Sequence, residues 1–263
     1  MAYDKKGLRD HRARGGPVYP GRQRFPQKKQ NHTDNNSVTR PMMFKAPDSL
    51  SEQIARHLGQ MIITGQLKAG ERIQEMRVAG ELNVSRGSVR EAYLILERRY
   101  LIDILPRKGA VVSSMTPKHV RNVYEVNIVL LTHLARVATQ VWKEEDLAEF
   151  LQLVQEMEGF VERNQVMDFY DATFQFARMA YRFADNPYLE DMLEDLQPLI
   201  RRTYYFAINT SRDEMDVSMK MFRDLMGQLI ARDADGAVKT LEAFGRHQCD
   251  TVLACLKNSS AAA

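Results

Sequence analysis

Cysteine is scarce in this sequence, which has only Cys249 and Cys255 among its 263 residues. So few thiols exclude the disulfide framework of small secreted domains and the paired spacings of a zinc site. The sequence also lacks an apolar run of about 18 residues, the least that a membrane helix needs, and an apolar N-terminal segment typical of a secretory signal. We therefore expect a cytoplasmic protein that makes no membrane contact.

Motifs of the common enzyme classes are missing as well. There is no phosphate-binding glycine loop, no paired metal-ligand motif and no nucleophile with a neighbouring base. The histidines are scattered along the chain: His11, His32, His57, His119, His133 and His247. The sequence therefore predicts neither an enzyme nor a bound cofactor.

Charge is divided unevenly along the chain. Residues 1–45 hold 11 Lys and Arg against 3 Asp, and residues 46–115 hold 10 basic against 8 acidic residues. Residues 116–263 are acidic, with 16 basic against 23 acidic residues. The basic N-terminal part and the acidic C-terminal part indicate that nucleic acid binds to the N-terminal part and another partner to the C-terminal part.

Residues 1–45 have the composition of a disordered basic arm, with few aliphatic residues, Gly and Pro pairs and no periodicity. Such an arm beside a DNA-binding domain adds salt-dependent contacts to phosphates. The alternatives are a solubilising tail and a wrongly assigned start, with Met42 or Met43 as the true one. The sequence does not decide between them.

Residues 46–115 follow the order of a winged helix-turn-helix: helix, helix, turn, helix and hairpin. Apolar residues recur at helical spacing from Leu50 to Ile63, and short helices are expected over 74–82 and 86–99. Two β-patterned runs, 101–105 and 110–113, flank a basic turn. The sequence predicts one DNA-binding domain here.

The third helix of this domain has the side chains that DNA recognition needs at its start. Arg86 and Arg90 lie one turn apart on the same face, and each planar guanidinium fits two acceptors on guanine. Ser85 is expected to cap the helix, whose N-terminus favours a phosphate. The DNA-binding residues predicted from this pattern are Ser85, Arg86, Ser88, Arg90, Arg107, Lys108 and Gly109.

After Thr116-Pro117 every long segment has a helical pattern. We expect six helices, starting near residues 117, 144, 165, 187, 211 and 234, with Ser211 and Glu214 forming a capping box. The expected domain covers 116–258, followed by a disordered tail over 259–263. The predicted fold class is mainly α: an N-terminal winged helix-turn-helix with a small β-hairpin, then an all-α bundle.

The segment from Leu50 to Ser114 resembles the DNA-binding domain of the GntR family of bacterial regulators. Ile-Thr-Gly-Gln-Leu-Lys-Ala-Gly-Glu-Arg-Ile matches its first turn, Asn-Val-Ser-Arg-Gly-Ser-Val-Arg-Glu-Ala its recognition helix, and Pro-Arg-Lys-Gly-Ala-Val-Val its wing. The resemblance implies that Arg86 and Arg90 contact DNA and that the wing around Lys108 touches the groove. The chain departs from the family pattern at Met76, where an Arg is usual, and the adjacent Arg77 is the residue expected to contact DNA there. It also departs at Tyr100, where Gly is common, and at Gly87-Ser88.

The helical half resembles the effector-binding FCD domain of the FadR-like branch, in the shorter six-helix, VanR-like version. Asp171-Ala-Thr-Phe-Gln175, followed by Ala-Asp-Asn-Pro-Tyr-Leu, carries this resemblance. Many members hold a metal ion with one Asp and three His. Of these ligands only Asp171 remains, because Gln175, Phe222 and Phe244 occupy the His positions, and Asn127 replaces an Arg that pairs with an effector carboxylate. The resemblance implies that the metal-and-carboxylate site is lost.

What replaces that site stays open at this stage. Phenylalanine and methionine side chains would make it an apolar pocket for a lipophilic effector, such as a fatty acid or an acyl-CoA. The other interpretations are a core filled by aromatic rings, with no effector, and a site for a polar effector. The predicted pocket residues are Asn127, Asp171, Gln175, Arg201, Tyr205, Phe222 and Phe244.

The sequence thus predicts a homodimeric, sequence-specific DNA-binding regulator, expected to be a repressor. One recognition helix reads only a few base pairs, and a two-fold dimer on a pseudo-palindromic operator doubles the site. The alternative is an architectural or effector-independent DNA-binding protein whose helical domain only dimerises.

Overall fold

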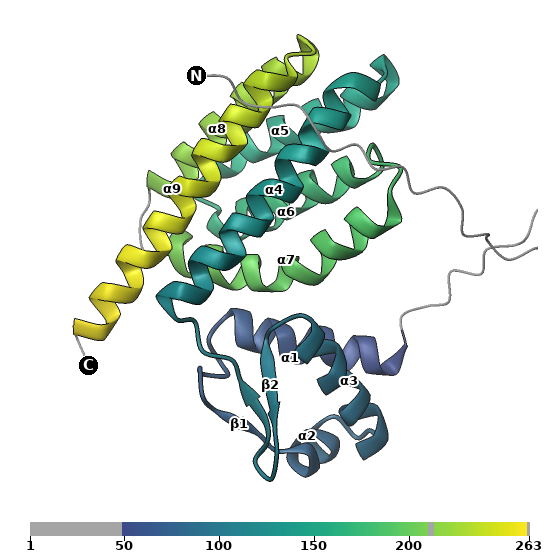
Figure 1. Ribbon diagram of the computed structural model, residues 1–263, viewed down its shortest axis with the longest axis vertical. Helices are drawn as coiled ribbons and strands as arrows, with labels where there is room; N and C mark the ends of the chain where they lie inside the picture. Colours follow the sequence, from purple (N-terminus) through teal and green to yellow (C-terminus); the bar gives the residue numbers. More distant parts are fainter. Residues whose placement is uncertain (1–48, 210–212, 262–263) are drawn as a thin grey trace, which may run out of the picture. The chain divides into compact units, whose positions relative to one another are not determined.

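The computed structural model describes residues 49–209 and 213–261 (Figure 1). The basic arm expected over residues 1–45, and Ser211 of the expected capping box, lie outside this part of the chain. The elements follow in the order α1 (Leu50–Ile63), β1 (Arg72–Ile73), α2 (Glu75–Glu81), α3 (Arg86–Arg98), β2 (Ile102–Leu105), β3 (Gly109–Val112), α4 (Pro117–Val141), α5 (Glu144–Glu162), α6 (Val166–Tyr181), α7 (Pro187–Ile208), α8 (Asp213–Ile230) and α9 (Ala234–Ala261). The predicted fold class is confirmed.

Serine hydroxyls cap two of the helices in the N-terminal part. Ser49 accepts a hydrogen bond from the Glu52 main-chain N–H (3.2 Å), and Ser85 accepts one from the Ser88 N–H (3.0 Å). Each cap satisfies a main-chain donor that the helix itself leaves free. The inner faces of α1, α2 and α3 pack with the sheet around one apolar core, which includes Ile54, Leu58, Val78, Val89, Leu96 and Ile102.

The sheet has three strands rather than the two of the predicted hairpin. β3 lies between β1 and β2 and is antiparallel to both, with Ile73 opposite Ala110 and Ile102 opposite Val112. The first strand was missed because it is two residues long, too short for alternation to show in the sequence. It holds the base of the hairpin beside the start of α2.

The helical part is built from α4 to α9, whose starts lie within about two residues of the predicted ones. Thr116 caps α4 through the His119 N–H, and Asn186 caps α7. α9 continues to Ala261, so the disordered tail expected from residue 259 is wrong in this respect.

α4 and α9 lie side by side along most of their length (Figure 1). Gly245 on α9 allows this approach, because a Cβ at that position would overlap the Ile128 side chain on α4. The core between the helices is rich in aromatic rings. Phe176 lies edge-on to Phe150 and to Phe222, at centroid distances of 5.0 and 4.9 Å.

Polar contacts join α7 to the N-terminal elements. The buried Arg202 guanidinium donates from Nη1 to the main-chain oxygen of Ser113 (2.9 Å) and to its Oγ (3.2 Å), and burial lowers the pKa of this guanidinium. Arg98 on α3 forms an ion pair with Asp195 on α7 (2.6 Å). Since Ser113 directly follows β3, Arg202 ties the end of the hairpin to the helical part.

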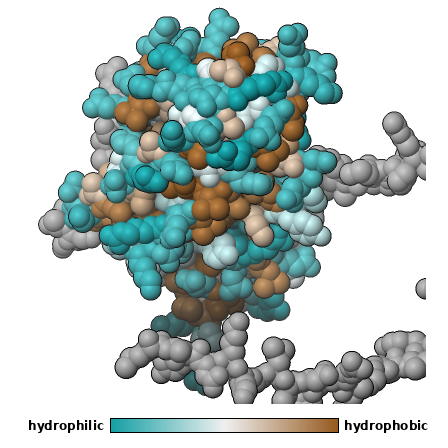
Figure 2. All heavy atoms as spheres, turned by 45° about the horizontal axis from the view of Figure 1, so that its top comes forward, coloured by the Kyte–Doolittle hydropathy of each residue, from teal (hydrophilic) through white to brown (hydrophobic). Residues whose placement is uncertain are grey.

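The surface is mixed, and the face in Figure 2 shows a group of apolar residues surrounded by hydrophilic ones. Exposed apolar side chains on α4 include Val126 and Val129, with exposed fractions of 49% and 62%. None of the helices among residues 49–209 and 213–261 is both long enough and apolar enough to span a membrane.

Candidate functional site

The start of α3 presents two exposed arginines that share one carboxylate. Arg86 donates from Nε to Oε1 of Glu75 (2.6 Å), and Arg90 donates from Nε to Oε2 of the same residue (2.7 Å). The arginine side chains are 58% and 63% exposed, whereas that of Glu75 is 21% exposed. Glu75, in the first turn of α2, therefore holds both guanidinium groups side by side while leaving each open to solvent.

The electrostatics of this cluster favour the charged form of Glu75. Hydrogen bonds from Arg90 and then from Arg86 lower the pKa of its carboxyl group below the ordinary value of 4.5. Sequence reasoning missed Glu75, which precedes the two arginines by 11 and 15 positions. Only the turn between α2 and α3 brings these positions together, so spacing along one helix gives no signal for the contact.

Ser85 and Ser88, both in the predicted set, lie at the same end of α3. Their hydroxyls are 2.9 Å apart, and the Ser88 N–H is bound to Ser85. Arg77, on α2, forms an exposed ion pair with Glu81 one turn along the helix (2.8 Å). Met76, where an Arg was expected from the resemblance, has 72% of its surface exposed.

The wing carries the remaining predicted DNA contacts at the turn between β2 and β3. Arg107 and Gly109 have φ angles of 66° and 77°, in the left-handed region that tight turns need. The Lys108 main-chain N–H closes this turn on the Leu105 oxygen (3.2 Å). Arg107 and Lys108 are exposed at its tip. A groove runs from the wing to α3, with Gly109 on one side and Arg86 and Arg90 on the other.

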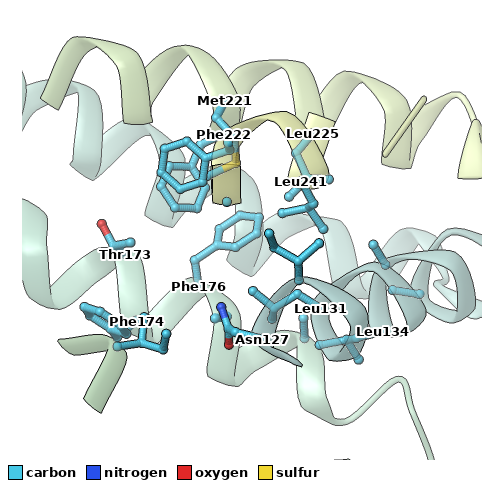
Figure 3. Close-up of a pocket in the computed structure, with 18 of the residues that line it drawn as sticks. Asn127, Leu131, Leu134, Thr173, Phe174, Phe176, Met221, Phe222, Leu225 and Leu241 are labelled. Carbon is cyan, nitrogen blue, oxygen red and sulfur yellow. The ribbon is translucent and has the colours of Figure 1, made fainter. Parts of the chain in front are cut away.

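A cavity of about 130 Å³ lies within the helical part, lined by residues of α4 to α9. Figure 3 shows Phe176, Phe222, Leu225 and Leu241 pointing toward one another, with the Asn127 amide close by. Phe244 and Gln248 of α9 line it too. The lining is apolar apart from a few amide and hydroxyl groups.

The structure separates the predicted effector-pocket residues into two groups. Asn127, Phe222 and Phe244 line the cavity, whereas the other four predicted residues do not: Asp171, Gln175, Arg201 and Tyr205. Helix periodicity is the reason, because α6 directs Thr173, Phe174 and Phe176 inward and leaves Asp171 and Gln175 exposed. From the sequence we expected both residues at the positions of metal ligands that face the cavity. In the structure they lie on the exposed face of α6 instead.

Arg201 engages Asp171 outside the cavity instead of an effector. Its guanidinium forms an ion pair with the Asp171 carboxylate and lies over the rings of Phe174 and Tyr170, at 4.5 and 5.1 Å from their centroids. Tyr205 packs edge-on against Tyr170 (5.8 Å). These residues support the wall of the cavity from behind.

The donor set does not fit a metal ion. Asp171 is 68% exposed and paired with Arg201, and phenyl rings stand at two of the positions that would need imidazole. No group of three or more His, Cys, Asp or Glu side chains in the described part of the chain is arranged to hold a metal.

Comparison with known proteins agrees with this geometry. Residues 50–112 match the model of the bacterial regulatory proteins of the gntR family, and residues 122–246 match the FCD domain. An uncharacterized HTH-type transcriptional regulator of Agrobacterium vitis is 30% identical over 135 residues, which cover 48% of this chain and 78% of that protein. The chain belongs to the GntR family.

Other GntR-type relatives extend over more of the chain. The HTH-type transcriptional repressor RspR of Escherichia coli is 27% identical over 193 residues, covering 73% of this chain and 84% of that protein. The structure of E. coli McbR/YncC has the same fold, with a TM-score of 0.68 at 20% identity over 79% of this chain and 98% of that one. The protein is a DNA-binding transcriptional regulator of the GntR type with an FCD domain, in a family of regulators and not of enzymes.

The backbone at Tyr100 lies in the left-handed region. This residue has a φ of 57°, a conformation that glycine adopts without steric cost. It is the position where the sequence departs from the glycine expected from the GntR resemblance. The Tyr100 side chain is half exposed and its main-chain oxygen accepts a hydrogen bond from the Ser113 hydroxyl (2.8 Å), which ties the turn after α3 to the end of β3.

Proposed function

We propose that this GntR regulator is a homodimeric repressor that binds a pseudo-palindromic operator, with Arg86 and Arg90 reading base edges in the major groove. The main support is that both arginines donate to the carboxylate of Glu75, which orients the two guanidinium groups at the exposed start of α3. The hydroxyls at Ser85 and Ser88 are placed for phosphate contacts there. Arg107 and Lys108 on the wing bind the adjacent backbone or minor groove.

Footprinting on the DNA upstream of the protein's own gene tests this proposal. A two-fold dimer protects two similar half-sites with centres about one or two helical turns apart. Protection of a single half-site, or of no defined sequence, contradicts it.

The exposed apolar side chains of α4 support dimerisation through the helical part. Val126 and Val129 lie one turn apart on the same exposed face. Sedimentation analysis of a Val126→Lys, Val129→Lys variant should show monomers where the unchanged protein shows dimers. A Leu151→Lys, Gln155→Lys variant adds the same two charges one turn apart on an exposed face of α5, and as the control it should leave the dimer intact.

The cavity in the helical part supports an effector that is mainly apolar, in the six-helix version of the FCD domain. A core completely filled by rings would favour an effector-independent or architectural DNA-binding protein, and the open volume of about 130 Å³ favours a sensor. Binding of the effector changes operator affinity only as far as it prefers one dimer geometry. Arg202, between α7 and Ser113, is the contact best placed to carry that preference to the DNA-binding part.

The basic segment 1–45 adds phosphate contacts in this proposal, because it holds 11 basic and 3 acidic residues. Removing residues 1–41 should then make DNA affinity less dependent on salt. If the dependence of DNA affinity on salt concentration does not change, the segment makes no phosphate contacts and is only a tail.

A further inference from the structure

The lining of the cavity contains no charged side chain. Its polar members are Asn127, Thr173, Tyr204 and Gln248, and the rest are aliphatic, aromatic, Met or Gly residues. Two of these polar groups are already engaged, because Thr173 donates to the Phe169 oxygen (2.9 Å) and the Tyr204 and Ser218 hydroxyls lie 3.0 Å apart. A charged ligand would lose its hydration here and find no opposite charge, which is costly.

Arg201, which contacts a ring in the cavity wall, does not change this conclusion. Arg201 lies over the Phe174 ring, but it is not among the residues that line the cavity, and Asp171 neutralises it. The cavity therefore offers nothing to pair with a carboxylate, a phosphate or the pyrophosphate of coenzyme A.

The volume of the cavity limits the size of its ligand. An engineered apolar cavity of about 150 Å³ in another protein accepts benzene, so a volume of about 130 Å³ suits a single ring or a chain of similar size. A long acyl chain exceeds this volume, which argues against the fatty acid or acyl-CoA suggested by the sequence.

Two amides in the cavity have free hydrogen-bonding capacity. Gln248 on α9 is more than nine-tenths buried, Asn127 on α4 is half-buried, and both line the cavity. Neither side-chain amide has a hydrogen-bond partner within residues 49–209 and 213–261. Because both amides lie in an otherwise mostly apolar lining, a ligand that bonds to them is favoured over one that cannot, and the pair points to a ligand with one polar, uncharged group.

We propose that the cavity binds a small, uncharged, ring-sized ligand whose single hydroxyl, carbonyl or amide group bonds to Gln248, with Asn127 as the second anchor. This inference rests on the proposed sensing function and specifies its ligand class. It separates the protein from FCD domains that hold a metal ion and a carboxylate effector, in line with the loss of that site expected from the sequence.

Matched probes of one ring size test the charge requirement on the full chain. Toluene and benzyl alcohol are uncharged, benzylammonium has nearly the shape of benzyl alcohol with a positive charge, and benzoate is the anion. Benzyl alcohol and toluene should raise the melting temperature in a concentration-dependent way, and calorimetry should give dissociation constants at least about tenfold larger for the two ions.

Variants test the position and the anchor. Ala177→Leu places a larger side chain in the cavity lining and should abolish binding of both uncharged probes. Gln248→Leu keeps the volume and removes the amide, so it should weaken benzyl alcohol binding to the level of toluene and leave toluene unchanged. If Ala177→Leu does not fold, the binding of benzyl alcohol and toluene to Gln248→Leu still tests the proposal.

The inference is overturned if benzoate binds as tightly as benzyl alcohol, if none of the four probes binds, or if folded Ala177→Leu binds them normally. Operator binding by the unliganded protein is measured on the same sample. If the protein binds the operator but none of the four probes, only this ligand class is rejected. If the protein does not bind the operator, the proposed function itself is rejected.

Discussion

The Nε–H of Arg90 donates to Oε2 of Glu75 at a distance of 2.7 Å, across the turn between α2 and α3. The carboxylate holds one edge of the guanidinium, and the arginine side chain stays 63% exposed. In the proposed function, the same carboxylate competes with DNA phosphates for the arginine. Glu75 would then orient the side chains of Arg86 and Arg90 and limit their attraction to DNA of any sequence.

Replacing Glu75 with Gln should raise affinity for random-sequence DNA by about threefold to tenfold, because one negative charge beside the phosphates is removed. Affinity for the operator should rise less, since the guanidinium groups lose their fixed orientation. The ratio of the two dissociation constants, measured by fluorescence anisotropy, should therefore fall. Glu162→Gln removes a charge from the exposed end of α5 and should leave this ratio unchanged; an equal fall in both variants would make the effect one of net charge.

The Glu75 carboxyl group should titrate below pH 4.5, because Arg90 and Arg86 bind its charged form. A folded-state pKa below the unfolded one gives stabilisation that is present above the unfolded value and is lost as the pH falls through the folded value. A carboxyl-detected NMR titration follows this directly. An Arg86→Ala, Arg90→Ala double variant should return the pKa toward 4.5, and an unchanged value would show that the two arginines do not bind Glu75 in solution.

Much of the fold could be predicted from the sequence because its signals are local. Helix starts at Thr116-Pro117 and Asn186-Pro187 combine a capping side chain with a proline at the first helical position, and both are confirmed. The strand at Arg72–Ile73 has no such signal. Its existence depends on pairing with Val111 and Ala110, almost forty residues along the chain.

In the candidate sites, too, contacts between residues far apart in the sequence could not be predicted. Arg86 and Arg90 could be placed on one helix face from their spacing, whereas Glu75 could not, because a turn brings it to them. Among the predicted pocket residues, Asn127 and Phe222 line the cavity. Asp171 lies outside the cavity. Which face of α6 points inward could not be read from the sequence, because apolar residues lie on two faces of this helix.

Removing the buried contact between the two parts should be costly. Arg202→Met leaves the Ser113 oxygen without its charged donor and should lower the free energy of unfolding by about 1–3 kcal/mol. Arg98→Ala breaks the exposed pair with Asp195 and should cost less than about 1 kcal/mol. Denaturant unfolding of both variants measures the difference, and similar losses would contradict the special role of Arg202.

The close approach of α4 and α9 predicts opposite effects for two glycines. Gly245→Ala adds a methyl group against Ile128 and should lower the free energy of unfolding by about 1–3 kcal/mol. Gly227→Ala, on α8, meets no atom within 4 Å and should raise it by about 0.5–1 kcal/mol through helix propensity. Thermal unfolding separates the two, and stabilisation by Gly245→Ala would contradict the packing of Gly245 on Ile128.

The central claim is that Arg86 and Arg90 read the operator, and the most direct measurement is DNA affinity of their alanine variants. Binding to the DNA upstream of the protein's own gene should weaken by about 1–3 kcal/mol for each arginine, with a loss of preference over random DNA. Arg98→Ala, which removes an arginine from the far end of the same helix, should bind as the unchanged protein does. Unchanged affinity in Arg86→Ala and Arg90→Ala, or an equal loss in Arg98→Ala, would contradict the assignment of α3 as the recognition helix.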